Sequence, residues 1–244
     1  MTSPVLLELR DEMAIVSLNA PPLNIFNLEM RDALIEALTA IRDISAHDPD
    51  GLKVMVLRSS GEHFSAGADL TEFGTAESIH EARRIRWDRD PWTILWELPV
   101  PCVAAISGFA VGSGLEMVLL CDIRVAAESA TLGLPETKLG MLPSAGGSQT
   151  LTRAIGAHQS VPLVALGETL TGPEAKRRGL VHEVALDANF AAMELASKLT
   201  SYRPAVARAM KRALHASGDL SLEAGLALER RLGAAVNTPA ADSN

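Results

Sequence analysis

The 244-residue sequence has few of the features that mark secreted, membrane-spanning or metal-binding proteins. It has only two cysteines, Cys102 and Cys121, each beside an apolar stretch, and no C-x-x-C motif, H-E-x-x-H motif or close His/Cys cluster. The cysteines therefore predict small buried side chains in a reducing compartment, and the missing motifs argue against a metal site. No run of eighteen apolar residues occurs, so we expect no membrane-spanning segment.

Positive charge is also scarce. The formal net charge is −8 at pH 7, which argues against a nucleic-acid binder because such proteins depend on basic surface. A small polyphosphate ligand is still compatible, since it needs only one local basic group or backbone amides. The first residues, MTSPVLLELRDE, resemble neither a signal peptide nor a transit peptide, and we therefore expect a cytoplasmic protein.

The sequence does contain alternating strand and helix patterns in its first half, and helical patterns dominate its second half. Strand patterns cover residues 5–10, 13–18, 53–58, 103–106 and 123–127. Helical patterns cover about 28–44, 75–97, 115–121, 147–155, 159–166, 173–178, 187–200, 204–215 and 221–236. Asn27 is expected to cap the first helix, residues 108–114 to form a loop, and the tail NTPAADSN to be disordered. The pattern predicts an α/β core followed by a helical region.

A glycine-rich turn, Gly112-Ser113-Gly114, leads into an apolar run that holds one carboxylate, Glu116. Backbone N–H groups at a helix start favour a phosphate or a developing oxyanion. Neither a dinucleotide fingerprint nor a P-loop fits, because Met117 replaces the third small residue and no Gly-Lys-Ser/Thr follows. Burial would raise the pKa of Glu116 and suit a general acid or base. The alternative is a tight turn, with Glu116 facing water or a distant arginine.

Two further stretches carry candidate chemistry. Glu136 follows a proline and lies among leucines, and Lys138 is close enough in sequence to pair with it. Residues 63–70, HFSAGADL, follow the strongest strand pattern and have small residues in the middle, which let a ligand approach the backbone. The alternative is a turn capped by Asp69. A serine-hydrolase elbow is disfavoured because His63 occupies the position of its first glycine.

Three stretches, HFSAGADL (63–70), ISGFAVGSGLEMVLLCDIRVAA (106–127) and LPETKLGMLPSAGGSQTLTRAIG (134–156), resemble the enoyl-CoA hydratase/isomerase family, the crotonase superfamily, in order and spacing. The resemblance extends from the N-terminal hairpin to about residue 215. It implies an α/β fold of the crotonase (ClpP/crotonase-like) type, a spiral of ββα units in residues 1–190. Residues 191–244 would then be a helical region that makes homotrimers, often stacked as hexamers.

The resemblance also implies how the site works. An acyl-CoA would bind with its thioester oxygen between two backbone N–H groups, which fall by position on Ala66 and Ser113. In hydratases of the family two glutamates act on one water molecule, and the matching residues are Glu116 and Glu136. Glu116 would activate the water and Glu136 would exchange the proton at C2, although the sequence does not fix which residue has which role.

Weaker matches concern substrate binding. The family positions that face the substrate correspond to Ala68, Asp69, Leu70, Gly114 and Pro143. Lys211 matches a basic position that reaches a CoA phosphate, and a solvated helix face is the equal alternative. Trp87 and Trp92 would wall the acyl pocket or pack in the core. The C-terminus lacks the Phe-containing ending of many relatives, which leaves the closure of the acyl tunnel open.

The expected activity is hydration of 2-enoyl-CoA to 3-hydroxyacyl-CoA, with no metal or redox cofactor, coenzyme A being part of the substrate. Two alternatives remain from the sequence. One is an isomerase that moves a 3-enoyl double bond to position 2, and the other is a non-catalytic protein that binds acyl-CoA.

Overall fold

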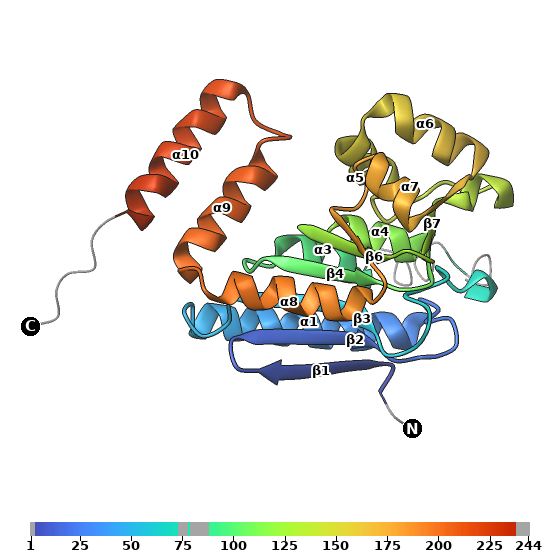
Figure 1. The fold of residues 1–244 in the computed structure, drawn as a ribbon, viewed down its shortest axis with the longest axis horizontal. Helices are drawn as coiled ribbons and strands as arrows, with labels where there is room; N and C mark the ends of the chain where they lie inside the picture. Colours follow the sequence, from blue (N-terminus) through green and yellow to red (C-terminus); the bar gives the residue numbers. More distant parts are fainter. Residues whose placement is uncertain (1–2, 73–77, 79–87, 238–244) are drawn as a thin grey trace, which may run out of the picture.

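The structure is a computed structural model, and it describes residues 3–72, 78 and 88–237. Within these residues six strands form one sheet in the order β1-β2-β3-β4-β6-β9 (Figure 1). Their bounds are β1 Val5–Arg10, β2 Met13–Leu18, β3 Val54–Ser59, β4 Cys102–Ile106, β6 Ile123–Ala127 and β9 Glu183–Ala185. β1 and β2 form an antiparallel hairpin, and the other neighbours pair in parallel. β4 is buried along its whole length, as expected for a parallel strand covered on both faces.

A smaller sheet has the order β5-β7-β8. Its strands are β5 Phe109–Val111, β7 Thr131–Gly133 and β8 Thr169–Thr171. β5 and β7 pair in parallel, so the segments that follow them begin side by side. These segments are the helix α4, Ser113–Leu119, and the 3-10 helix η3, Pro135–Leu139. The two candidate glutamates lie on them, and this pairing brings them together from 20 residues apart.

Helix α1, Leu28–His47, and helix α8, Ala188–Thr200, pack on the strands of the large sheet. The Asn27 side chain accepts a hydrogen bond from Met30 N–H, so the predicted cap is confirmed. α1 buries Leu34, Leu38 and Ile41 on one face, in agreement with their spacing. α8 packs against β3, β4 and β6, so the expected division at residue 190 falls inside a helix of the core.

The remaining helices pack on these elements or on one another. They are α3 Pro91–Glu97, α5 Gly147–Ile155, α6 Ala157–Leu166, α7 Gly172–Arg177, α9 Pro204–Ala216 and α10 Leu222–Val236, with a 3-10 turn η1 at Leu70–Glu72. α9 and α10 pack on each other; α9 contacts the core through Lys211 and His215, and α10 extends beyond it (Figure 1). No helix among the described residues has the length and apolar character to cross a membrane.

Most predicted elements agree with the structure to within a few residues at each end. The prediction of a loop at 108–114 is wrong, because β5 occupies 109–111 and α4 begins at 113. The predicted all-helical second half is also wrong at β8 and β9. These strands have three residues each, too few for an alternating pattern to register. Most of the helix expected at 75–97, and the expected disordered tail after Asn237, lie outside the described residues.

Candidate active site

Gly112 shapes the start of α4. It adopts φ +56° and ψ −127°, which favours glycine, and its N–H donates to the Gly133 carbonyl of β7 at 2.9 Å. A Cβ at this position would lie 3.1 Å from Oε1 of Glu136. Glycine therefore serves twice here, because it turns the chain into α4 and leaves room for the carboxylate on η3.

Glu116 lies in the first turn of α4 and is only 2% exposed. Its Oε1 accepts hydrogen bonds from the N–H groups of Ala145, at 2.9 Å, and Gly147, at 2.8 Å. Burial raises the pKa of Glu116, and the two N–H groups partly oppose that rise. The alternative in which Glu116 faces water is therefore wrong, and the predicted rise in pKa is confirmed.

Glu136 has an even clearer preference for its proton. Burial raises its pKa to about 7, and the negative charge of Glu116 adds to the effect. Its Oε2 is buried and has no hydrogen-bond partner among the residues that the structure describes. Lys138 does not pair with it, since the aliphatic part of that side chain lies against Gly167 instead.

Both carboxylates line one small cavity of about 110 Å³. A larger cavity of about 590 Å³ lies next to it and shares Ala68, Ser113 and Ser144 with it. The two spaces therefore meet at these three residues, where a bound molecule would contact both the carboxylates and the larger cavity.

The prediction that the N–H of Ala66 binds the oxyanion is wrong. Its N–H donates to the Leu23 carbonyl at 2.9 Å and is not free for a ligand. The N–H of Ala68 is available to a ligand, because no acceptor for it occurs within the described part of the chain. Phe26 pairs with this segment through the Gly67 carbonyl and the Asp69 N–H, so the N–H of Ala68 points to the opposite side.

Ser113, the other expected donor, is the first residue of α4. Its N–H has no acceptor within the helix, as for every residue of a first helical turn. Both Ser113 and Ala68 line both cavities. Ala68 therefore replaces Ala66 as the candidate partner of Ser113 in an oxyanion hole.

The loop after Ala68 has mixed roles. Asp69 accepts hydrogen bonds from the hydroxyl and the N–H of Thr71, which lower its pKa, so the turn-capping alternative is confirmed for this residue. Leu70 lines the small cavity and is 53% exposed. A substrate at the carboxylates would therefore pass Leu70 near the surface.

Two other expected contact residues are packed inside the protein. A Cβ on Gly114 would lie 2.8 Å from the Ser65 carbonyl, so this glycine lets α4 approach the segment at 65–68. Pro143 is buried and lines neither cavity, although Leu142 and Ser144 beside it line the small cavity. The hydroxyl of Ser65 donates to the Asn24 carbonyl at 2.7 Å, which further disfavours a serine nucleophile.

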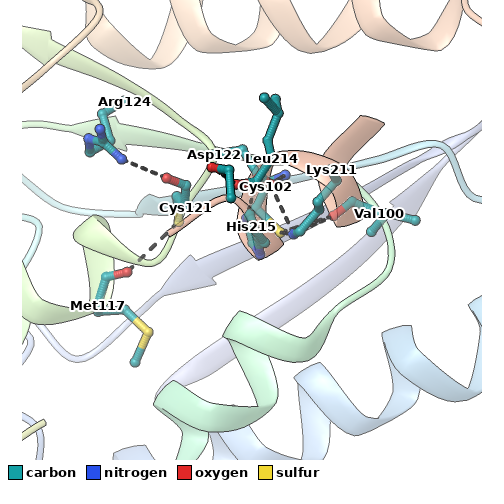
Figure 2. A network of polar contacts seen from close by, with 10 residues as sticks. Val100, Cys102, Met117, Cys121, Asp122, Arg124, Lys211, Leu214 and His215 are labelled. Atoms are coloured by element: carbon teal, nitrogen blue, oxygen red, sulfur yellow. Dashed lines mark hydrogen bonds and ion pairs between the residues drawn. The ribbon is translucent and has the colours of Figure 1, made fainter. Parts of the chain in front are cut away.

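Both interpretations of Lys211 from the sequence, a contact to a CoA phosphate and a solvated helix face, are wrong. It is 5% exposed, so its face of α9 is not solvated. Its Nζ ion-pairs with Asp122 at 2.9 Å and donates to the Val100 carbonyl at 2.9 Å (Figure 2). Because the ammonium group is held inside the protein, it is not placed to reach a CoA phosphate.

Trp92 satisfies both of its expected roles. It is 6% exposed and packs against Phe26, and it also lines the larger cavity. Its indole N–H donates to the Ser113 carbonyl at 3.3 Å, which ties α3 to the start of α4. Trp87 lies outside the described residues. Among the described residues no group of three or more His, Cys, Asp or Glu side chains is arranged to hold a metal ion.

Two N–H groups beside two carboxylates whose pKa values are raised suit enzymes that form or consume an enolate, and the protein's fold and cavities agree with that class. Comparison with known proteins identifies the family. A model of the family described as enoyl-CoA hydratase/isomerase matches residues 8–241, and the chain belongs to this family. It is therefore an enzyme of the crotonase superfamily.

Individual relatives agree with this assignment. The chain is 35% identical over 239 residues to the 2,3-dehydroadipyl-CoA hydratase of Escherichia coli K12, with 94% of this chain and 89% of the relative covered. An enoyl-CoA hydratase structure from Bacillus anthracis superposes with a TM-score of 0.87 at 33% identity, covering 96% and 90% of the two chains. DspI of Pseudomonas aeruginosa gives a TM-score of 0.88 at 30% identity, covering 98% and 90%. The expected crotonase fold is confirmed.

Proposed function

We propose that the protein hydrates 2-enoyl-CoA thioesters to 3-hydroxyacyl-CoA. The observation that carries the proposal is the pair of glutamates, the buried Glu116 and the half-buried Glu136, on one cavity beside the N–H groups of Ala68 and Ser113. The name of the Escherichia coli relative, a hydratase of an enoyl-CoA, supports the same reaction.

The thioester oxygen would lie between the N–H groups of Ala68 and Ser113. Attack of water at C3 moves electrons from the double bond onto this oxygen and forms an enolate. Two fixed donors in a water-poor cavity stabilise that charge more than they stabilise the neutral thioester, so they lower the barrier. The start of α4 adds the positive end of its dipole.

The two glutamates would divide the proton transfers. Glu116 is held through Oε1, so its other oxygen can hold the water and take its proton as the C3–O bond forms. Glu136, with a pKa of about 7, carries a proton near neutrality and gives it to C2. One water is added across the double bond, and transfer of the captured proton back to Glu136 restores the starting state. This reaction needs no metal or redox cofactor.

The proposed roles predict a pH profile. Because Glu136 must be protonated, kcat/KM for crotonyl-CoA is expected to fall as the pH rises through about 7. At low pH the rate is expected to fall again as Glu116 gains a proton and can no longer accept one. Initial rates between pH 5 and 9 at constant ionic strength measure the profile, and circular dichroism controls for unfolding. A flat profile between pH 6 and 9 would contradict the role of Glu136.

A substrate panel tests the proposed function directly. We expect hydration of crotonyl-CoA, detected by loss of the conjugated thioester absorbance. An isomerase is the second candidate, because a proton carrier such as Glu136 alone serves that reaction. Glu116→Gln separates the two, since isomerisation of 3-enoyl-CoA would survive this substitution and hydration would not. Tight binding of acyl-CoA with no turnover of any enoyl-CoA would overturn both.

We also propose that α9 and α10 mediate a homotrimer or a dimer of trimers. These helices expose large apolar side chains, among them Leu214 at 63% and Leu222 at 80%. Exposed apolar surface of this kind suits self-association. Light scattering after size exclusion measures the assembly.

A further inference from the structure

Two cavities have one pair of rings in both of their walls. The first is the cavity of about 590 Å³ at the active site, which extends from Ala68 and Ser113 to Trp96 and His215. A second cavity of about 680 Å³ lies among the end of α3, α9 and α10. Trp96, His215 and Asp219 line both cavities, so these side chains separate them.

The two rings form a flat stack. The centroids of Trp96 and His215 are 4.0 Å apart and the ring planes differ by 10°. Trp96 lies in the last turn of α3, and His215 lies near the end of α9. The stack therefore joins α3 to the C-terminal helix α9 at the boundary between the two cavities.

A polar network of the buried Lys211 and the half-buried Asp122 fixes the position of His215. Its Nε2 lies 2.8 Å from Oδ1 of Asp122. Asp122 in turn accepts the Cys102 N–H at 2.7 Å and pairs with Lys211 at 2.9 Å. Figure 2 shows His215, Asp122 and Lys211 gathered where α9 meets the ends of the strands. The hydrogen bond to Asp122 thus holds the ring of His215 against Trp96.

The third shared residue, Asp219, contributes less. Its ion pair with Arg153, at 3.2 Å, joins side chains that are 66% and 54% exposed. Exposed pairs of this kind are weak and are readily broken. The barrier between the cavities therefore rests on the stacked rings.

We propose that Trp96 and His215 form the end wall of the acyl-binding cavity and restrict the enzyme to short acyl chains. This inference rests on the proposed function. A chain that grows from the thioester fills the larger cavity until it meets the indole and imidazole. The space beyond, under α9 and α10, would accept more methylenes only if the rings were absent. The network of Asp122 and Lys211 acts by positioning His215.

Binding of unreactive saturated acyl-CoAs tests the wall without requiring turnover. Calorimetry on a series from butanoyl-CoA to hexadecanoyl-CoA gives the affinity at each chain length. Each buried methylene is expected to raise the affinity about fourfold, and the gain is expected to stop at the length that reaches the wall. In Trp96→Ala we expect the gain to continue, so that two further methylenes bind about fifteenfold more tightly relative to the wild type.

Matched variants keep the test interpretable. Trp96→Phe retains a ring and is expected to keep the wild-type limit. His215→Gln removes the second ring but retains an N–H that can donate to Asp122, and it is expected to shift the limit as Trp96→Ala does. Phe190→Ala removes a 63% exposed ring on α8, away from both cavities, and is the control. Circular dichroism and thermal melts confirm that each variant folds.

Two failures have different meanings. If the wild type hydrates crotonyl-CoA but the limit is the same in folded Trp96→Ala and His215→Gln, the wall is refuted and the proposed function stands. If the wild type hydrates no enoyl-CoA but the limit moves as expected, the proposed function fails and the wall stands. A wild type whose affinity rises steadily to hexadecanoyl-CoA would also refute the wall.

Discussion

Glu136→Gln is expected to lower kcat for crotonyl-CoA hydration by about 10²- to 10⁴-fold, which is the usual contribution of a positioned acid or base. Glutamine has nearly the same shape but has no acidic proton to give to C2. Since Oε2 of Glu136 has no partner among the described residues, the exchange breaks no hydrogen bond at that atom. Affinity for butanoyl-CoA is therefore expected to change little. The fall in kcat/KM is expected to come from kcat, with KM nearly unchanged.

Glu116→Gln is expected to cause a loss of the same order. The glutamine Oε1 can still accept from Ala145 and Gly147, so the loop keeps its shape while the base is lost. In the double variant the losses should not add, because the two residues act on one water. Glu168→Gln, at an exposed position, is the matched control. Full turnover in either single variant would refute the two-glutamate mechanism.

Ser113→Pro is the second large effect that we expect, a loss of about 10²- to 10³-fold in kcat, or roughly 3–4 kcal/mol of transition-state stabilisation. Proline removes one backbone N–H from the proposed oxyanion hole. Ser113 is the first residue of α4, where proline is well tolerated because that N–H has no helical partner. The substitution thus deletes one donor while keeping the helix, which side-chain replacements cannot do.

Ser113→Ala is the control for this prediction. It keeps the N–H and removes only the hydroxyl, whose hydrogen bond slightly lowers the pKa of Glu116. We expect turnover close to that of the wild type. Thermal melts of both variants report on folding, and equal activity of folded Ser113→Pro and Ser113→Ala would show that this N–H does not stabilise the transition state.

Much of the fold could be predicted because its signals are local and repeated. The apolar spacing of α1 and its Asn27 cap gave the helix and its start, and the continuous apolar runs gave β3 and β4. The burial of Glu116 followed from its leucine neighbours on one helix. β8 and β9 were missed because three residues carry no period, and because their pairing partners are distant in sequence.

The predictions at the site failed where the direction of a backbone N–H or the partner of a side chain matters more than the residue type. Ala66 and Ala68 are identical in kind and only two residues apart, but Leu23 takes the N–H of the first and leaves that of the second free. Lys211 belongs to a helix that looks basic and solvated in sequence. Its burial depends on Asp122, a partner 89 residues away, and no local pattern reports such a pairing.

The hydrogen bonds from Ala145 and Gly147 mean that the loop between η3 and α5 positions Glu116, the residue proposed as the base. That loop also supplies Met141, Leu142 and Ser144 to the small cavity. One segment therefore determines both what shape of substrate fits beside the carboxylates and how Glu116 is oriented. Evolution or engineering that reshapes this loop for a new acyl group must change turnover at the same time.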